Sequence, residues 1–312
     1  MLQVVQAGGY LQKTTVTADL MQSWISFLDA SPKTVATYTR AIRQFWKYLQ
    51  NNHITEPKRE DLLSYRQSMI DGGKAASTIK SYMTAAKLFF AWLADKGLYP
   101  NIGEHVKTAK VQQYYHKDYL TTRQARALVG ACNQETESGA RDYALIRLMT
   151  TAGLRTIEVI RADVEDLGTV GDDTVLYVQG KGRSEKAEYV KLAPAAEDAI
   201  RRYLAIRGEN QGPLFTSTAH RNHGQRMTTR SISRIVKGHM QDIGLNSKRL
   251  TAHSLRHTAA HAMIKAGESL DNVQRVLRHS NISTTMIYLA EQAREANNGE
   301  LAADAYLFGT GE

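Results

Sequence analysis

A tyrosine near the C-terminus lies close in sequence to a histidine, and both side chains could take part in chemistry. The stretch LRHSNISTTMIYLAE, residues 277–291, places His279 nine positions before Tyr288, with a polar, turn-forming run between them. A tyrosine hydroxyl can act as a nucleophile, but its reference pKa of ~10 keeps it mostly protonated at neutral pH, so it needs orientation and a proton acceptor. Taken alone, Tyr288 is more simply interpreted as a core residue with its ring buried and its hydroxyl at the surface.

Groups that could bind an anion collect upstream of this tyrosine. The segment GLRTIEV puts Arg155 just after a glycine at the start of a helix, three residues before Glu158 and within reach of an ion pair with it. The segment TAHSLRHTAAH puts His253 and Arg256 in the first turn of a helix, where the N-terminus already attracts anions. Lys181 lies in a GKG turn, which leaves its ammonium exposed on a flexible stem. Each residue alone fits a surface ion pair, a core histidine or a solvated lysine, but their combination favours a shared site.

Three histidines offer a competing interpretation, a metal site on one helix. His253, His257 and His261 follow one another at i, i+4 and i+8, and HTAAH superficially resembles a zinc-binding helix. A zinc protease of that type requires glutamate at position 258, where this chain has Thr258, and no carboxylate motif nearby supplies a third ligand. We therefore predict that the site holds no metal.

Composition bounds the kind of protein that carries these groups. At 312 residues the chain exceeds the usual size of one domain, so we expect two. The net charge of +9 and the pI near 9.5 favour a polyanionic partner, either nucleic acid or an acidic membrane surface. Most of this attraction lies in residues 1–117, which hold 15 basic and 8 acidic residues, a net of +7.

Cysteine content and hydropathy indicate the compartment. The single cysteine, Cys132, excludes an internal disulfide framework and argues for a reducing compartment. The first residues lack the charged and apolar regions of a signal peptide, and no run approaches the ~20 apolar residues of a membrane span. We expect a soluble cytoplasmic protein without a membrane partner.

Hydrophobic periodicity predicts an all-α N-terminal domain over residues 17–97, after a flexible tail at 1–16. Its helices are expected at about 17–28, 31–49, 59–70 and 77–94. Ser31 is the expected N-cap of the second helix, with Pro32 at its first helical position. Basic and hydroxyl side chains beside the apolar stripes predict a surface that tracks phosphates. The residues predicted to contact DNA are Lys33, Thr37, Arg40, Lys74, Lys80 and Lys87.

Residues 98–117 contain proline and glycine with weak periodicity and are predicted to link this domain to a second one at 118–312. Strand patterns are confined to one part of the second domain. Residues 174–180 and 187–192 flank a turn and predict a hairpin, and RADVEDL, residues 161–167, is expected to supply a short third strand. The expected fold is mainly α (α+β): an all-α four-helix domain and a mostly helical domain with a small antiparallel β-sheet.

The ordered segments GLRTIEV, GKGRSEKAEYVKL, HSLRHTAAHAMIKAG and LRHSNISTTMIYLAE resemble the motifs of the tyrosine recombinase (phage integrase) family. The resemblance extends over about residues 15–295, since the basic four-helix domain is similar to that family's core-binding domain. Two positions depart from the family pattern. Arg278 stands where glycine usually precedes the histidine, and Leu289 follows the tyrosine where histidine is frequent. Arg278 either crowds its turn or adds a phosphate contact.

The resemblance implies an enzyme that cuts and rejoins duplex DNA at specific sites through a covalent 3′-phosphotyrosyl intermediate. The residues that match the family's catalytic positions are Arg155, Lys181, His253, Arg256, His279 and the nucleophile Tyr288. Attack on a phosphodiester brings a nucleophile to a centre that already carries negative charge. Arg155 and Arg256 are expected to stabilise that charge in a bidentate geometry that lysine cannot match.

The proton transfers are expected to fall to three other side chains. His253 is the expected acceptor of the Tyr288 proton, and His279 the expected donor to a phosphate oxygen. Lys181 is the general acid that the resemblance assigns to the leaving 5′ oxygen. Because the phosphotyrosine keeps the bond energy, religation needs neither ATP nor a metal, and no cofactor is expected.

The resemblance also implies partners and an assembly. These are double-stranded DNA recombination sites, a clamp of the two domains around the duplex, a homotetramer on two DNA sites, and accessory DNA-bending or directionality proteins. The C-terminal residues Leu301, Ala305 and Phe308 either dock onto a neighbouring subunit, as that family's C-terminal helix does, or pack on their own domain. A second hypothesis is a non-catalytic DNA-binding protein on the same fold, which acts through its basic helices.

Overall fold

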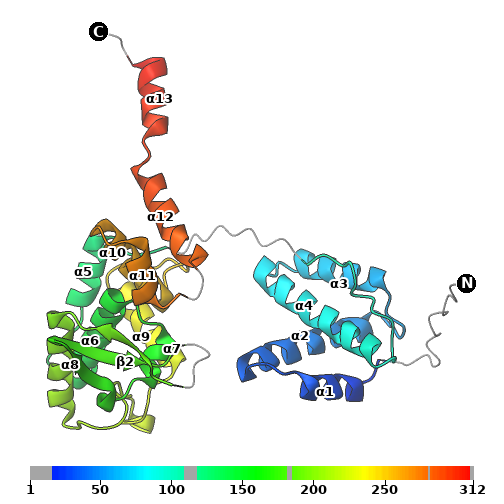
Figure 1. Cartoon of the computed structure of the whole chain (residues 1–312). Coiled ribbons are helices and arrows are strands. Elements are labelled where there is room, and N and C mark those ends of the chain that lie inside the picture. Colours follow the sequence, from blue (N-terminus) through cyan, green and yellow to red (C-terminus); the bar gives the residue numbers. More distant parts are fainter. Residues whose placement is uncertain (1–15, 109–117, 181–184, 280–281, 310–312) are drawn as a thin grey trace, which may run out of the picture. The chain divides into compact units, whose positions relative to one another are not determined.

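A computed structural model of the chain describes residues 16–108, 118–180, 185–279 and 282–309. The chain divides into two compact units, Met1–Tyr114 and Tyr115–Glu312, which we call unit 1 and unit 2 (Figure 1). None of the helices in the described ranges is long and apolar enough to cross a membrane.

Unit 1 is helical. Its described helices are α1 (Ala18–Phe27), α2 (Pro32–Asn51), α3 (Arg59–Asp71) and α4 (Ala76–Asp95). Ser31 caps α2 as predicted, since its side chain accepts a hydrogen bond from the backbone N–H of Thr34 at 3.3 Å. The apolar stripes meet in an aromatic core in which Trp24, Phe45 and Phe89 are at most 2% exposed. The predicted all-α fold of the N-terminal domain is confirmed.

Packed chain extends beyond the predicted helices at both ends of unit 1. Val16, which we expected in the flexible tail, is 3% exposed, and Val106, which we expected in the linker, is 1% exposed. Both belong to the core of unit 1. Each should therefore stabilise the unit, since burying a valine side chain contributes about 1.5–3 kcal/mol relative to leaving it exposed. The rest of the predicted tail, 1–15, and the end of the predicted linker, 109–117, lie outside the described residues.

Unit 2 is mostly helical and contains one small sheet (Figure 1). Its described elements are α5 (Thr122–Gly130), α6 (Glu137–Ala152), α7 (Thr156–Arg161), the 3-10 helix η1 (Val164–Asp166), β1 (Leu167–Val170), β2 (Asp173–Val178), β3 (Glu188–Lys191), α8 (Pro194–Arg207), the 3-10 helix η2 (His220–Asn222), α9 (Thr229–Asp242), α10 (Ala252–Lys265), α11 (Leu270–Leu277), α12 (Ser283–Ala296) and α13 (Gly299–Phe308). Helix α6 packs against α5, α8, α9 and α10, so it connects the two sides of the unit.

The sheet is antiparallel in the order β1-β2-β3, and Leu176 of β2 pairs with Leu167 and Val190. The predicted hairpin is confirmed, but the prediction of a third strand at residues 161–167 was wrong. Within that segment the backbone N–H of Asp163 donates to Asp166 Oδ2 at 2.7 Å, which closes the 3-10 turn η1. The strand therefore begins only at the last residue of the segment.

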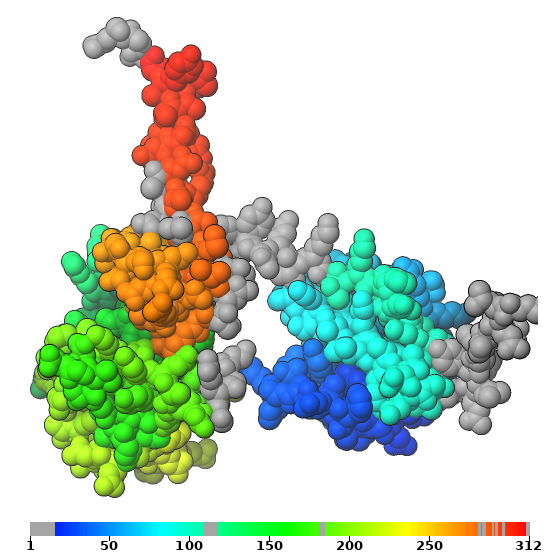
Figure 2. Space-filling model, viewed as in Figure 1, coloured from blue at the N-terminus to red at the C-terminus, as the bar shows by residue number. Residues whose placement is uncertain are grey.

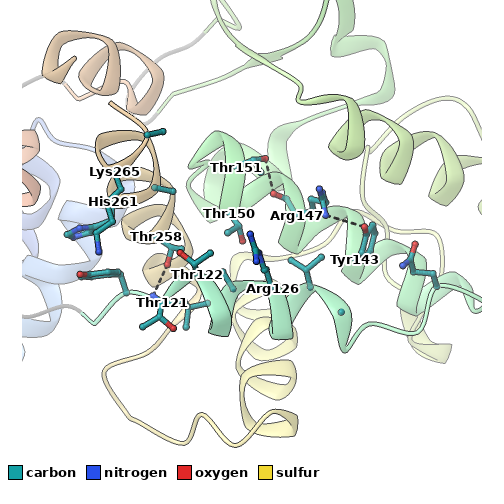
Figure 3. Close-up of a pocket in the computed structure, with 18 residues that line it drawn as sticks. Thr121, Thr122, Arg126, Tyr143, Arg147, Thr150, Thr151, Thr258, His261 and Lys265 are labelled. Atoms are coloured by element: carbon teal, nitrogen blue, oxygen red, sulfur yellow. Dashed lines mark hydrogen bonds between the residues drawn. The ribbon is translucent and has the colours of Figure 1, made fainter. Parts of the chain in front are cut away.

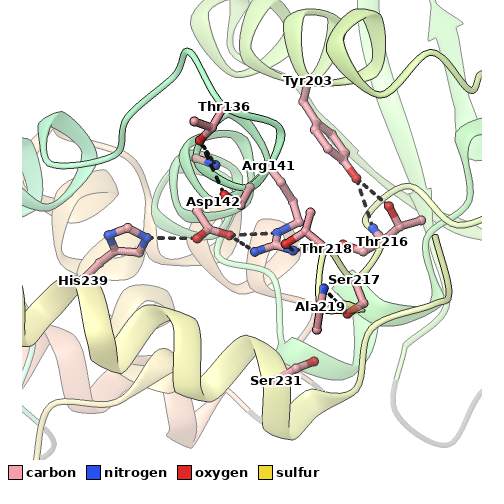
Figure 4. Close-up of polar contacts among 12 residues, drawn as sticks. Thr136, Arg141, Asp142, Tyr203, Thr216, Ser217, Thr218, Ala219, Ser231 and His239 are labelled. Carbon is pink, nitrogen blue, oxygen red and sulfur yellow. Dashed lines mark hydrogen bonds and ion pairs between the residues drawn. The ribbon is translucent and has the colours of Figure 1, made fainter. Parts of the chain in front are cut away.

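A buried polar network joins α6 and α9 to the segment that follows α8 (Figure 4). Arg141 Nε donates to Asp142 Oδ1 at 2.8 Å, and Arg141 Nη1 donates to the Thr216 carbonyl at 3.2 Å. His239 Nε2 lies 3.0 Å from Asp142 Oδ2, and this hydrogen bond raises the pKa of His239. The hydroxyls of Tyr203 and Thr216 share a hydrogen bond of 2.9 Å. Because a buried charge is costly unless it is paired, this network holds α6 in one position relative to α9.

Candidate active site

The C-terminal end of α6 begins the site. Gly153 ends the helix in the left-handed conformation, at φ 61°, as the sequence predicted. A Cβ on this residue would lie 2.4 Å from Leu277 Cδ2, so any other residue here would force the Leu277 side chain to shift and would also adopt a left-handed angle that favours glycine. The close approach places the end of α6 against the end of α11. Two residues later, Arg155 is the N-cap of α7.

The two predicted arginines are held by backbone carbonyls at these helix ends. Arg256 lies in α10 and is 1% exposed. Its Nη1 donates to the Gly153 carbonyl at 2.7 Å and its Nη2 donates to the Leu277 carbonyl, while Arg155 Nη2 donates to the Arg278 carbonyl at 3.3 Å. Burial and the charge of Arg155 lower the pKa of Arg256 to about 9, so Arg256 stays protonated at neutral pH.

A fully buried carboxylate, Glu158, lies at the centre of this group. Its Oε1 accepts from Arg155 Nη1 at 2.7 Å, and its Oε2 accepts from the Arg155 backbone N–H and from Arg278 Nη2, both at 2.8 Å. Arg256 Nη1 lies 3.9 Å from the same Oε2. Burial raises the pKa of Glu158, but Arg278, Arg155 and Arg256 outweigh it and leave the pKa below its ordinary value. We call Arg155, Glu158, Arg256 and Arg278 the arginine cluster.

The side chain of Arg278 points inward, toward Glu158. Arg278 caps α11 in the left-handed conformation, at φ 54° and ψ 49°, which is the geometry that favours glycine. Its side chain is 4% exposed and donates through Nη1 to the Val276 carbonyl at 2.6 Å and through Nη2 to Glu158. The residue therefore occupies a left-handed position that is unfavourable for a side chain, and its guanidinium contacts a carboxylate of the protein.

His279 follows directly in the chain and adds a neutral imidazole beside the cluster. Burial, Arg256 and Arg155 lower the pKa of His279 to about 3, so the ring is uncharged at neutral pH. Its Nδ1 lies 2.9 Å from the hydroxyl oxygen of Thr285, a residue of the first turn of α12 that is 0% exposed.

Tyr288 lies in α12 with its side chain 2% exposed, in an apolar cluster formed with α10 and α11. Its ring centroid lies 5.2 Å from that of His257, 5.4 Å from that of His261 and 6.3 Å from that of His279. His253 is exposed and packs edge-on against His257 at 4.8 Å. Tyr288 is thus a core residue in its packing and also a neighbour of the predicted site.

The histidines of the competing metal interpretation pack as aromatic rings. His261, a residue of α10, stacks on Tyr119 with ring centroids 3.6 Å apart. The same ring also packs against Tyr288. Within the ranges that the structure describes, no group of three or more His, Cys, Asp or Glu side chains could hold a metal ion.

Lys181, the predicted general acid, lies outside the described residues. Gly180, which precedes it, lines a cavity of about 560 Å³ together with Arg155, Arg278 and His279. The segment that follows β2 and the arginine cluster therefore border the same space.

The predicted DNA contacts of unit 1 differ in their exposure. The residues with exposed side chains are Lys33, Arg40, Lys74 and Lys80. Thr37 is partly buried, and its hydroxyl donates to a backbone carbonyl of α2 at 2.9 Å. Lys87 is also partly buried, and its Nζ donates to the Val106 carbonyl at 2.6 Å. Lys87 thus has a structural contact that the sequence did not suggest.

Sequence reasoning brought together Arg155, Arg256 and His279, but it missed three features of the site. The spacing of Arg155 and Glu158 gave the ion pair, yet nothing in the sequence indicated that the carboxylate also binds Arg278. The contact of Thr285 with His279 had no sequence signal either. The sequence also suggested His253, His257 and His261 as possible metal ligands, whereas in the structure the rings of His257 and His261 pack against the ring of Tyr288 in α12.

Comparison with known proteins identifies the family of the chain. Residues 118–295 match the model of the phage integrase family, and residues 19–99 match the N-terminal SAM-like domain of phage integrases. A tyrosine recombinase of Synechococcus elongatus is 31% identical over 285 residues, which cover 86% of this chain and 88% of that protein. Tyrosine recombinase XerD of Listeria monocytogenes is 28% identical, with 86% of this chain and 93% of the relative covered.

Solved structures share the fold at lower sequence identity. The XerH site-specific recombinase bound to a palindromic difH substrate has a TM-score of 0.68 at 20% identity, with 87% of this chain and 79% of that chain covered. A lambda integrase dimer bound to a core site has a TM-score of 0.71 at 18% identity, with 88% and 78% covered. The matches confirm the predicted fold, and the chain belongs to the phage integrase family of tyrosine recombinases.

Proposed function

We propose that this chain is a site-specific tyrosine recombinase that cleaves and rejoins duplex DNA. The observation that carries the proposal is the arginine cluster, in which two guanidiniums are already held in place beside His279 and the Tyr288 ring. Donors that are fixed before the substrate arrives need no reorganisation when charge develops in the transition state. The curated relatives, which are tyrosine recombinases, support the same reaction.

The reaction proceeds by two transfers at one phosphorus. Tyr288 Oη attacks the scissile phosphate, the bond from phosphorus to the tyrosine oxygen forms, and the bond from phosphorus to the 5′ oxygen breaks. The tyrosine proton passes to His253, and Lys181 protonates the leaving 5′ oxygen. Arg155 and Arg256 bind the non-bridging oxygens. Attack by a 5′ hydroxyl of another strand reverses these steps and releases Tyr288.

The two units divide the work on DNA. We assign the four helices of 17–97 as the core-binding domain, 98–117 as the linker and 118–312 as the catalytic domain, and we propose that both domains close around the duplex. Unit 1 holds most of the net charge of the chain, which suits non-specific attraction to phosphates.

Covalent capture tests the reaction. The wild-type chain is incubated with a pool of nicked duplexes of randomised sequence, and protein that carries DNA after denaturation is recovered and sequenced. The expected result is a covalent band that retains a label placed on the strand segment 5′ to the break, because that segment ends in the 3′ phosphate bound to the tyrosine. Tyr288→Phe should abolish it, whereas the matched control Tyr177→Phe, a tyrosine of β2, should not.

The same experiment separates the second hypothesis. A non-catalytic DNA-binding protein would shift duplexes in a native gel and yield no covalent band with either Tyr288 or phenylalanine at this position. That result would contradict the recombinase proposal. Attachment through a 5′ phosphate would contradict the assigned polarity.

The exposed basic residues of unit 1 can be tested by salt dependence. Each phosphate contact that is lost should reduce the slope of log K against log salt by about 0.9. The double variant Lys33→Gln/Arg40→Gln should therefore bind DNA more weakly and with a shallower slope. Lys58→Gln, a change at an exposed residue before α3, is the control and should leave the slope unchanged.

We also propose that the enzyme acts as a homotetramer on two DNA sites, with α13 docked on a neighbouring subunit. Every described residue of α13 is exposed, including Leu301 at 70% and Phe308 at 78% (Figure 2). A cavity of about 710 Å³ between α5, α6 and α10 offers an acceptor (Figure 3). Its lining includes Arg126, Arg147 and Lys265 and no carboxylate, whereas α13 carries Glu300 and Asp304. A lambda integrase structure of the same fold is a tetramer bound to a Holliday junction, which supports this assembly.

A charge reversal in the cavity and a new charge on α13 test the docking. Phe308→Asp and Arg147→Glu should each reduce cooperative assembly on DNA, measured by mass photometry with two-site duplexes. Ile206→Asp, on exposed α8 surface outside the cavity, is the control. If both variants form normal tetramers, α13 does not dock in this cavity and the docking proposal is wrong. Accessory DNA-bending or directionality proteins would appear in the same assay as factors that raise the fraction of tetramers on two-site duplexes.

A further inference from the structure

The contact between His279 and Thr285 leaves a chemical choice open. Nδ1 and the hydroxyl oxygen can each carry a hydrogen, but the 2.9 Å between these two atoms has room for only one hydrogen. Either Nδ1–H donates to the hydroxyl, or the hydroxyl donates to the lone pair of Nδ1. Because His279 is neutral, its single N–H is on Nδ1 in the first case and on Nε2 in the second.

The reaction needs the second case. This step rests on the proposed function, in which His279 donates a hydrogen bond to a phosphate oxygen. Nδ1 is already occupied by Thr285, so the donor must be Nε2–H. A ring with its hydrogen on Nδ1 would present the lone pair of Nε2 to the phosphate and would repel it.

The position of Thr285 favours a hydroxyl that donates. Threonine in helices often donates to the carbonyl four residues back, as Thr84 and Thr150 do here at 2.8 Å and 2.6 Å. Thr285 is the third residue of α12, so no residue of that helix lies four positions before it. The positive end of the α12 dipole lies at the same turn, and it favours a lone pair over an N–H on the neighbouring Nδ1.

We propose that Thr285 is a positioning residue for the recombinase reaction, because its hydroxyl donates to His279 Nδ1 and thereby keeps the hydrogen on Nε2, where it can bind the scissile phosphate. The residue acts on the ring and has no contact with the substrate of its own. Its complete burial excludes water, which could otherwise replace the hydroxyl as the donor to Nδ1.

Two substitutions separate the hydroxyl from the shape of the side chain. Thr285→Val keeps the branched shape and removes the donor, whereas Thr285→Ser keeps the donor and removes a methyl group. Full-length protein with ¹⁵N-labelled histidine reports the tautomer through long-range ¹H–¹⁵N correlations, with the His279 signals assigned from their loss in His279→Asn. Cleavage is measured in single turnovers on a nicked duplex recovered by covalent capture, alongside the dissociation constant for the same DNA.

The expected result has two parts. His279 is the Nε2–H tautomer in the wild type and in Thr285→Ser, and it shifts toward Nδ1–H in Thr285→Val. Thr285→Val lowers the cleavage rate about tenfold, the equivalent of one neutral hydrogen bond, with DNA affinity unchanged, and Thr285→Ser stays within about twofold.

Each contrary outcome identifies what fails. An Nδ1–H ring in the wild type, or a tautomer that Thr285→Val leaves unchanged, overturns the proposal. So does a cleavage rate in Thr285→Val equal to that of the wild type. If the wild type forms no covalent product with any DNA, the proposed function fails, and the spectra still decide whether Thr285 sets the tautomer.

Discussion

Replacing Arg278 by glycine tests how the arginine cluster offsets an unfavourable backbone. The substitution removes the Arg278 hydrogen bond to Glu158, and a hydrogen bond to a buried charge contributes about 1.5–3 kcal/mol. The loss should lie near the middle of that range, about 2 kcal/mol, because Glu158 keeps two hydrogen bonds from Arg155. Glycine also relieves the left-handed backbone, which costs other residues roughly 1 kcal/mol. The net expectation is a destabilisation of about 1 kcal/mol.

Arg278→Ala isolates the backbone contribution, because it removes the same hydrogen bond and keeps the strained angle. It should cost about 2 kcal/mol. For a unit of this size 1 kcal/mol shifts Tm by about 2–4 °C, so we expect losses of roughly 3 °C for glycine and roughly 6 °C for alanine in thermal unfolding of the full chain. A glycine variant with a Tm at or above that of the wild type would refute the reasoning, since the contact with Glu158 would then be weaker than the strain that it offsets. Equal losses in the two variants would show that the left-handed angle carries no strain.

Two further predictions concern the helices that support the site. The raised pKa of His239 means that its proton stabilises the fold fully below about pH 6.5 and that this stabilisation is lost as pH rises through the folded pKa. His239→Gln should therefore lower Tm more at about pH 6 than at about pH 8.5, and an equal loss at both would show that the bond to Asp142 is not charge-dependent. Gly153→Ala should cost about 3 kcal/mol, because it adds a contact at 2.4 Å from Leu277 to the strain of a left-handed alanine. Gly171→Ala has the same φ of 61° with open space around it, and in chemical denaturation it should cost only about 1 kcal/mol.

Periodicity predicted the helices because the fold buries one face of each. The stripe of α2 and the cap at Ser31 are local signals, and both are present in the structure. The third strand was misplaced because Ala162 and Val164 alternate with polar residues in RADVEDL, while the acidic side chains of this segment close a 3-10 turn on the backbone. Its strand signal and its turn signal occupy the same residues, and side-chain hydrogen bonding to the backbone decides between them.

The site was predictable to the extent that its residues are set by local spacing. Arg155 lies three residues before Glu158, and Arg256 lies three residues after His253, so each pair could be recognised within one helical turn. The contact of Arg278 with Glu158 joins residues 120 positions apart, and no pattern in a single sequence encodes it. It depends on the end of α11 lying against the end of α6, which follows from the packing at Gly153.

These long-range contacts give the site a fixed charge before DNA arrives. Three guanidiniums share the carboxylate of Glu158, which leaves two positive charges in a mostly buried cluster. The pKa of Arg256 is about 9, that of His279 is about 3, and that of Glu158 is below its ordinary value, so none of the three changes its charge near neutral pH. A phosphate entering the cluster therefore meets the same field throughout this range. Any titration of the cleavage rate near neutral pH must come from the groups that move protons, not from those that hold the phosphate.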